Sequence, residues 1–368
     1  MRIVFIILLI IHASIHLFGF LKAFGFAEFE ALKQPITKGL GLFWLLAFGL
    51  LLATAIAFLM SSERWWIISF FALVVSQVLV FWFWSDAKYG TVLNLLILIP
   101  TILGYADFSF QKRLGLERAE LFDQTQFLDQ NLVRPADVSV LPPAVKKWLM
   151  NSGVVGKKRA SNVYLVQELQ LRLKPDQSEW NYGKADQYFS IEPPSFHWKM
   201  NMDMNALMSV AGRDQYKEGK GEMLIKIQSL IPVADAKEDK KIDQATLQRY
   251  LAEMVWFPSA ALSSYVKWEH LDEHSAKATF SYQGVTGSGV FHFDEAGAFQ
   301  KFVAMRYKDA KDPKPTEWIV SALKTEEKNG IKIPTECEAS WTLENGSWTW
   351  LKLRIVQLTY NVEKQGSI

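Results

Sequence analysis

Residues 3–21 read IVFIILLIIHASIHLFGFL, an apolar run without a charged side chain. Three more apolar runs follow it within the first hundred residues, at 40–60, 65–84 and 91–105. A helix needs about 20 apolar residues to cross roughly 30 Å of hydrocarbon, and each run approaches that length. The sequence therefore predicts an all-α, four-helix transmembrane domain over residues 1–106. We expect a multi-pass protein of the cell membrane, with the lipid bilayer as a partner.

Charge and cysteine content exclude some classes of function. The chain has 40 Lys and Arg against 38 Asp and Glu, and the basic residues are interleaved with acidic ones. This balance gives no basis for nucleic-acid binding. The single cysteine, Cys337, excludes an internal disulfide. No motif for a phosphate loop, a catalytic nucleophile or a zinc protease occurs, so we expect no cofactor, no metal site and no catalytic residue, and an enzyme is the less favoured class.

Two histidines in the first apolar run are candidates for a membrane site. His12 and His16 are four residues apart and share a helix face. Ionisable groups inside a span are costly and often functional, so a haem or metal site or a proton relay is one interpretation. The other is that both imidazoles form hydrogen bonds to neighbouring helices. The second is favoured, since a bis-histidine haem needs partners on another helix, and the four other histidines all lie beyond residue 190.

The joints between the runs hold the remaining membrane-site candidates. Asp86 and Lys88 lie between the third and fourth runs, with Asn94 about one turn further on. They predict either a substrate or ion gate or, preferably, a charge-anchored hairpin. Lys22, at the end of the first run, is expected to extend its ammonium group to the membrane interface. Lys and Arg divide five to four between the two sides, which leaves the orientation open.

Residues 107–150 predict a helical stalk or linker, and the pattern changes after it. From about residue 161 apolar and polar side chains alternate, as in Val163–Leu173, and turn signals such as 328–330 and 344–346 separate such runs. Residues 151–368 therefore predict a mainly antiparallel β domain of about eight to eleven strands. One inserted helix is expected, with Asp243 as its cap. The predicted fold is thus a transmembrane bundle followed by a curved sheet or half-barrel.

The stretch LQRYLAEMVWFPSA at residues 247–260 resembles the signature of an uncharacterised family of bacterial membrane-associated proteins. Trp268 and the hairpin at 291–297 fit the same family, and the resemblance covers most of residues 140–361. The strand-helix-strand order is similar to the half-barrels of LolA-like lipoprotein carriers, and the four-span region resembles small DoxX-like bundles. The LolA-like resemblance implies that the β domain lies outside the cytoplasm.

The concave face of such a sheet is the expected place for a hydrophobic ligand. The candidate ligand-binding residues are Arg249, Tyr250, Glu253, Met254, Trp256 and Phe257. We expect binding of a lipid or acyl chain, in envelope lipid or lipoprotein handling; if the helix fills the concavity, the core is dry. The alternatives are an assembly protein that docks a membrane protein or a second copy of itself, and a membrane redox protein that uses His12 and His16.

Overall fold

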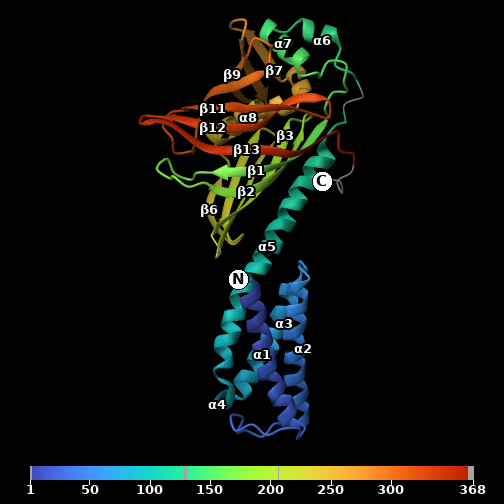
Figure 1. Ribbon diagram of the computed structural model, residues 1–368, viewed down its shortest axis with the longest axis vertical. Coiled ribbons are helices and arrows are strands. Elements are labelled where there is room, and N and C mark those ends of the chain that lie inside the picture. The colour runs from blue at the N-terminus through green and yellow to red at the C-terminus, as the bar shows by residue number, and fades with distance from the viewer. Residues whose placement is uncertain (1, 128–130, 206, 364–368) are drawn as a thin grey trace. The chain divides into compact units, whose positions relative to one another are not determined.

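The computed structural model describes residues 2–127, 131–205 and 207–363. They divide into two compact units, and each is considered by itself. The first unit extends to Arg113 and includes Gln228–Leu230, and the second contains the rest of the chain. The predicted fold class is confirmed, since apolar helices make the first unit and a curled antiparallel sheet with an inserted helix makes the second (Figure 1).

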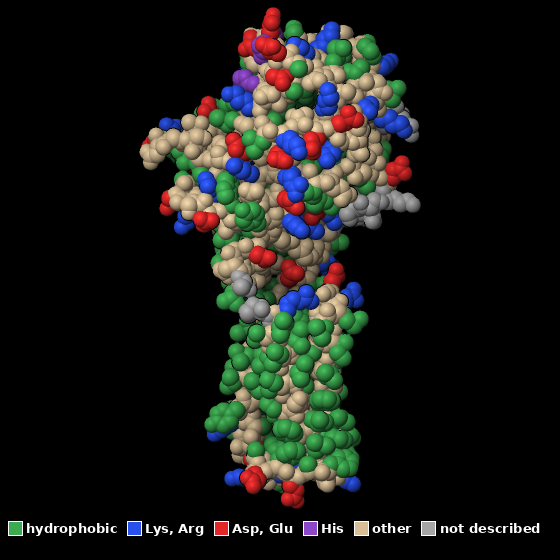
Figure 2. All heavy atoms as spheres, viewed as in Figure 1, with side chains coloured by type: hydrophobic (Ala, Val, Ile, Leu, Met, Phe, Trp, Pro, Cys, Tyr) green, Lys and Arg blue, Asp and Glu red, His purple; other side chains and the backbone are tan. Residues whose placement is uncertain are grey.

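Within the described residues, four helices of the first unit are long and apolar enough to cross a membrane. They are α1 (Arg2–Ala23), α2 (Lys38–Leu59), α3 (Trp65–Trp82) and α5 (Gly90–Gln124), and the short α4 (Trp84–Ala87) joins the last two. Figure 2 shows that hydrophobic side chains cover most of the visible surface of these helices. Exposing so many outward-facing aliphatic and aromatic side chains to water would be unfavourable, whereas the hydrocarbon of a bilayer solvates them well.

The interior of the helix unit is packed through small residues. Ala13, Ala47, Ala55 and Ala72 are buried in it. Gly19 lies directly against the ring of Trp44, where a Cβ atom would overlap the indole. Small residues at helix contacts let backbones approach closely, which is how membrane helices associate without a hydrophobic driving force.

Helix α5 is longer than the sequence predicts. Pro100 lies inside it, and the helix continues through Gln124 rather than ending near Tyr105. Its last turns, from Leu114, belong to the second unit, where Leu114 and Leu121 are buried. The apolar positions between residues 107 and 124, which the sequence assigns to a stalk, are therefore a continuation of the fourth apolar helix.

The described residues of the second unit contain 13 strands in one sheet, more than the eight to eleven expected, and every neighbouring pair is antiparallel. The order is β6-β5-β4-β3-β2-β1-β13-β12-β11-β10-β9-β8-β7, so β1 pairs with β13 in the middle, and β6 and β7 are the edges. The bounds are β1 Asn162–Leu171, β2 Asn181–Ser190, β3 Ser195–Asn205, β4 Met208–Lys217, β5 Lys220–Ile227, β6 Ile231–Ala236, β7 Val266–His270, β8 Ser275–Tyr282, β9 Val285–Phe293, β10 Phe299–Arg306, β11 Thr316–Lys328, β12 Ile331–Leu343 and β13 Gly346–Tyr360.

Helix α8 (Lys240–Glu253) connects the two edge strands and packs against the sheet. Its N-cap is Asp239, whose carboxylate accepts from the backbone N–H groups of Lys241 and Ile242. The expected cap, Asp243, is wrong: it lies within the helix, is buried, and accepts from the N–H of Gly221 on β5 at 2.8 Å. The carboxylate thus joins the helix to the sheet, because an N–H buried at that contact needs an acceptor.

Two short helices, α6 (Pro135–Ser139) and α7 (Pro143–Asn151), precede the sheet. The ring of Trp148 on α7 stacks on Phe291 and Phe293 of β9, with centroids 6.0 and 5.5 Å apart. Trp148 is buried in the same apolar cluster as the middle of α8. This segment of the predicted linker is therefore part of the core of the sheet unit.

Candidate functional site

The concave side of the sheet holds a cavity of about 330 Å³ that α8 does not fill. Six tryptophans line it among the described residues, together with ten aliphatic or sulfur-containing side chains and seven polar or charged ones. The tryptophans are Trp198, Trp256, Trp318, Trp341, Trp348 and Trp350. Drug-sized and lipid-like ligands bind in concave, mainly aromatic and aliphatic pockets of about 300–1,000 Å³.

The strand register builds one wall of this cavity. Trp318 on β11 pairs with Trp341 on β12, and Trp341 pairs in turn with Trp348 on β13. Residues directly opposite on antiparallel strands project to the same face, so the three indoles line one wall. The rings of Trp318 and Trp341 have centroids 6.3 Å apart. Val320 and Ala339, the next inward pair, leave the space that larger side chains would occupy.

Polar groups from α8 and β4 also line the cavity. Arg249 forms ion pairs with Asp214 on β4 and with Glu253 one turn further along α8, the latter at 2.8 Å. Glu253 also accepts a hydrogen bond from Gln187 at 2.8 Å. The guanidinium of Arg249 lies over the ring of Trp198, 4.9 Å from its centroid. Burial raises the pKa of Glu253, although the neighbouring Arg249 opposes that change.

A second arginine, Arg306 at the end of β10, lies on the tryptophan wall. Its Cζ atom is 4.5 Å from the ring centroid of Trp318 and 5.7 Å from that of Trp341. Its Nε donates to the carbonyl oxygen of Ala245 on α8 at 2.8 Å. Lys308 lies over the same Trp341 ring at 5.8 Å. The wall therefore presents cations beside aromatic faces, an arrangement that attracts anions and still offers apolar contact.

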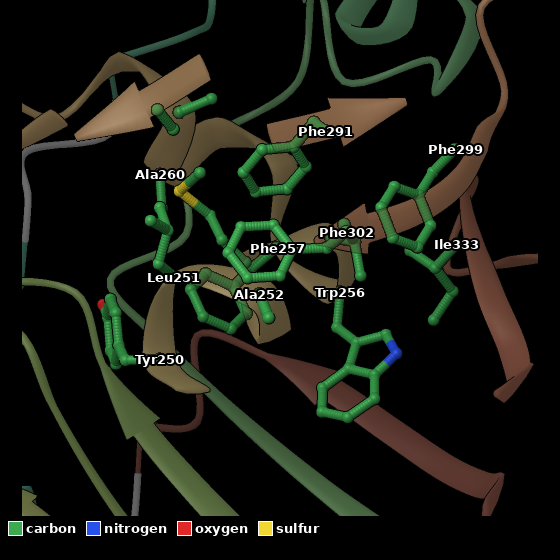
Figure 3. Close-up of a cluster of buried hydrophobic side chains, with 14 of the residues drawn as sticks. Tyr250, Leu251, Ala252, Trp256, Phe257, Ala260, Phe291, Phe299, Phe302 and Ile333 are labelled. Atoms are coloured by element: carbon green, nitrogen blue, oxygen red, sulfur yellow. The ribbon is translucent and has the colours of Figure 1, made fainter. Parts of the chain in front are cut away.

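The predicted ligand residues separate into two groups. Arg249, Glu253 and Trp256 line the cavity. Tyr250, Met254 and Phe257 are fully buried in the core on other faces of the helix and its following turn. Figure 3 shows part of this core, in which the rings of Tyr250 and Phe257 have centroids 5.7 Å apart.

Sequence reasoning missed the tryptophan wall and Arg306. Trp318, Trp341, Trp348 and Arg306 come from four different strands, and their meeting depends on strand register. A partial signal is present in Trp348-Thr349-Trp350, where two large aromatics occupy alternate positions and so share one face.

In the helix unit, the histidines take part in a buried hydrogen-bond network. His12 Nε2 lies 2.8 Å from Asn94 Oδ1, and His16 Nε2 lies 2.8 Å from Ser76 Oγ. Ser76 donates its hydroxyl hydrogen to Asn94 Oδ1 at 2.9 Å, and Asn94 donates to Gln77 at 2.9 Å. The carbonyl oxygen of Asn94 can only accept a hydrogen bond, so His12 Nε2 carries a hydrogen. Because the hydroxyl hydrogen of Ser76 is donated to Asn94, His16 Nε2 must also carry a hydrogen and donate it to Ser76 Oγ. The network joins α1, α3 and α5 in the way that the second interpretation of the histidines describes.

The other membrane-site candidates form contacts at the end of the helices. Lys22 donates to the carbonyl oxygens of Leu32 and of Gln34, the latter at 3.1 Å, in the loop after α1. Asp86 accepts from the backbone N–H of Gln34 at 2.7 Å, and this hydrogen bond lowers the pKa of the carboxyl. The ammonium of Lys88 lies 5.3 Å from the ring centroid of Tyr89. The contacts of Lys22 and Asp86 therefore connect the loop before α2 with α1 and with α4.

A second cavity, of about 760 Å³, lies beside this network. His12 and His16 line it, but so do side chains with large exposed areas, including Phe18, Tyr89 and Val92. In a bilayer such a groove faces lipid, and acyl chains of ordinary membrane lipids would fill it. We therefore take the tryptophan-lined cavity of the sheet unit as the candidate ligand site.

Comparison with known proteins gives a family and several solved structures. A family model described as "Family of unknown function (DUF6920)" matches residues 139–360. No curated protein matches the chain. Among solved structures the chain is similar to a DUF1329 family protein from Desulfovibrio piger (12% identity, TM-score 0.37, covering 64% of this chain and 95% of that one). It is also similar to a LolA superfamily protein from Nitrosomonas europaea (9% identity, TM-score 0.33, covering 62% and 97%). A third is a beta-barrel-like protein of DUF1849 from Brucella abortus (11% identity, TM-score 0.23, covering 55% and 99%).

The matched region coincides with residues 140–361, most of which the resemblance to an uncharacterised family covers, and that part of the expectation is confirmed. The likeness to DoxX-like bundles stays a prediction. With more than half of its residues matched, this chain belongs to the DUF6920 family, a family of unknown function.

Proposed function

We propose that this protein is a multi-pass membrane protein whose half-barrel binds an apolar ligand of the acyl-chain type, in envelope lipid or lipoprotein handling. The observation that carries the proposal is the cavity of about 330 Å³ on the concave face, with its lining of tryptophans. A protein core normally packs to the density of an organic crystal and leaves few voids larger than a water molecule. A void of this size, lined by large apolar rings, supports a binding role.

Unpartnered donors in the wall support the same role. The indole N–H groups of Trp318, Trp348 and Trp350 are buried and lack a hydrogen-bond partner within the described residues. Buried polar groups in proteins are satisfied in the large majority of cases, and each exception needs an explanation. Three such donors around one cavity are what we expect where a bound molecule completes the site.

The membrane half of the proposal rests on the helices of the first unit. Their length, composition and outward apolar side chains support spanning of the bilayer (Figure 2). We place the sheet unit outside the cytoplasm, and the support for that side is the sequence resemblance to LolA-like carriers. A reporter fused at the carboxyl terminus that is active only outside the cytoplasm tests this placement, and a signal from a cytoplasm-only reporter would refute it.

The binding role is tested by the lipid that accompanies the purified full-length protein. Val320→Trp places a large ring in the cavity, beside Ala339. Leu323→Trp, on the same strand, adds an identical ring at a position that is 52% exposed. Lipids around the membrane helices are the same in both variants, so their difference reports the cavity. We expect extraction and mass spectrometry to show about one lipid-like molecule fewer per chain for Val320→Trp. Equal lipid content in the two folded variants would contradict the proposal.

A further inference from the structure

The cation on the tryptophan wall differs from the other buried arginine near the cavity. Arg249 is neutralised by Asp214 and Glu253. Arg306 is half-buried, and within the described residues no carboxylate oxygen lies within 4.0 Å of it. Its hydrogen bond from Nε to Ala245 uses one of five N–H donors.

The terminal nitrogens of Arg306 are accessible from the cavity. Among the described residues, neither terminal nitrogen of Arg306 belongs to the fully buried side-chain nitrogens that lack a hydrogen-bond partner. Since Arg306 lines the cavity and its hydrogen bond to Ala245 involves Nε alone, the terminal amino groups have exposed surface there. The planar fork of a guanidinium matches the two oxygens of a carboxylate or phosphate.

Other charges on the wall leave this fork available. Lys308 lies beside Arg306 over the Trp341 ring, and its ammonium donates to Thr316 at 3.2 Å. Glu338 lines the cavity too, but among the described residues it forms no ion pair with Arg306. Burial lowers the pKa of Arg306 to about 10, with the charge of Arg249 acting in the same direction and those of Asp214 and Glu253 opposing it, so the guanidinium is still charged at neutral pH.

We propose that the ligand of the half-barrel carries an anionic head group, a carboxylate or a phosphate, which binds the terminal nitrogens of Arg306 beside Lys308 while its chain lies along the tryptophan wall. This inference rests on the proposed function, and it narrows the ligand class from any apolar molecule to acidic amphiphiles. A charge-assisted, bidentate contact in a desolvated place is among the stronger hydrogen-bonding arrangements in proteins.

The test compares probes that differ in the head group alone. Dodecanoic acid, dodecyl phosphate and dodecanol are titrated against the full-length protein in detergent, and bound molecules are counted by native mass spectrometry. We expect the acid, the phosphate or both to bind at least about tenfold more tightly than the alcohol. The acidic probe that binds more tightly identifies the head group.

Variants separate this inference from the proposed function. Arg306→Met keeps a long side chain on the Trp318 ring but removes the charge, and we expect it to abolish the preference for acids while dodecanol binds as before. Arg354→Met is the matched control, because Arg354 is an exposed arginine paired with Glu168 outside the cavity. Equal binding of acid and alcohol by the unaltered protein overturns the acidic-head inference and leaves the proposed function standing. If Val320→Trp binds every probe as well as the unaltered protein does, both the inference and the proposed function are overturned. The same holds if the unaltered protein binds none of the probes.

Discussion

The guanidinium of Arg306 lies on the face of the Trp318 indole, 4.5 Å from the ring centroid, at the wall of the cavity. This contact holds a cation next to an apolar surface, and no carboxylate in the described part of the chain pairs with it. The residues come from neighbouring strands, β10 and β11, and Arg306 also binds the backbone of α8. Arg306 therefore contacts both the tryptophan wall and helix α8.

Replacing Trp318 tests that contact. Trp318→Phe keeps an aromatic face under Arg306, whereas Trp318→Leu removes it, so we expect the leucine variant to be less stable by about 0.5–2 kcal/mol beyond the phenylalanine variant. The measurement is the thermal unfolding of the full chain in detergent. Equal stabilities of the two variants would show that the stacked guanidinium contributes nothing.

The position of α8 depends on a close approach at Gly221. A Cβ atom there would lie 2.8 Å from the carbonyl oxygen of Ile242 and would also overlap Thr246. Gly221→Ala should therefore displace the helix and lower stability by about 1–3 kcal/mol. Gly115→Ala on α5 is the control, since a Cβ atom there meets nothing within 4 Å and alanine favours a helix by about 0.5–1 kcal/mol. A Gly221→Ala protein as stable as the control would contradict the observed packing.

Buried His197 on β3 makes the stability of the sheet unit depend on pH. Burial lowers the pKa of His197, and the charge of Arg213 acts in the same direction. The carboxylate of Glu117, 3.4 Å from His197 Nε2, opposes this change. A lowered folded-state pKa means that the neutral imidazole stabilises the fold above its unfolded pKa of about 6.5, and that this stabilisation is lost as the pH falls. Between pH 8 and pH 5 the unfolding temperature should fall more for the unaltered protein than for His197→Gln.

The exposed His270 at the end of β7 provides the comparison for that experiment. We expect His270→Gln to follow the pH dependence of the unaltered protein. Parallel curves for all three proteins would mean that His197 has no part in the pH response.

The polar network of the helices predicts a cost for losing Asn94. Asn94→Leu leaves the donors of His12 and Ser76 without their acceptor, and interhelical hydrogen bonds in membranes contribute about 0.6–2 kcal/mol. The variant should unfold at lower temperature or lower denaturant concentration in detergent. Leu95→Ala, at a neighbouring position that is 55% exposed, is the control and should have a smaller effect.

Much of the architecture could be predicted because burial leaves periodic marks on the sequence. Long apolar runs indicated the helices, and alternation in Val163–Leu171 indicated β1. The missed strands lack that mark for physical reasons. β6 and β7 are edges with mostly exposed or half-exposed side chains, and β4 buries the polar side chains of Arg213 and Gln215.

The site was predictable on one side only. Helical spacing placed Arg249 and Glu253 on one face of α8, since residues four apart are neighbours on a helix. The opposite wall required the pairing of Trp318 with Trp341 and of Trp341 with Trp348, and register is a property of the whole sheet. Likewise, the cap at Asp239 lies four residues before the acidic residue that the pattern favoured, because Asp243 serves the contact with β5.

The most direct measurement is photo-crosslinking of a long-chain carboxylic acid bearing a diazirine near its end to the full-length protein in detergent, with the adducts mapped by peptide mass spectrometry. The account predicts adducts on the lining segments around Trp318–Val320, Ala339–Trp341 and Trp348–Leu353, and their loss in Val320→Trp but not in Leu323→Trp. Adducts confined to the apolar helices, or an unchanged pattern in Val320→Trp, would contradict it.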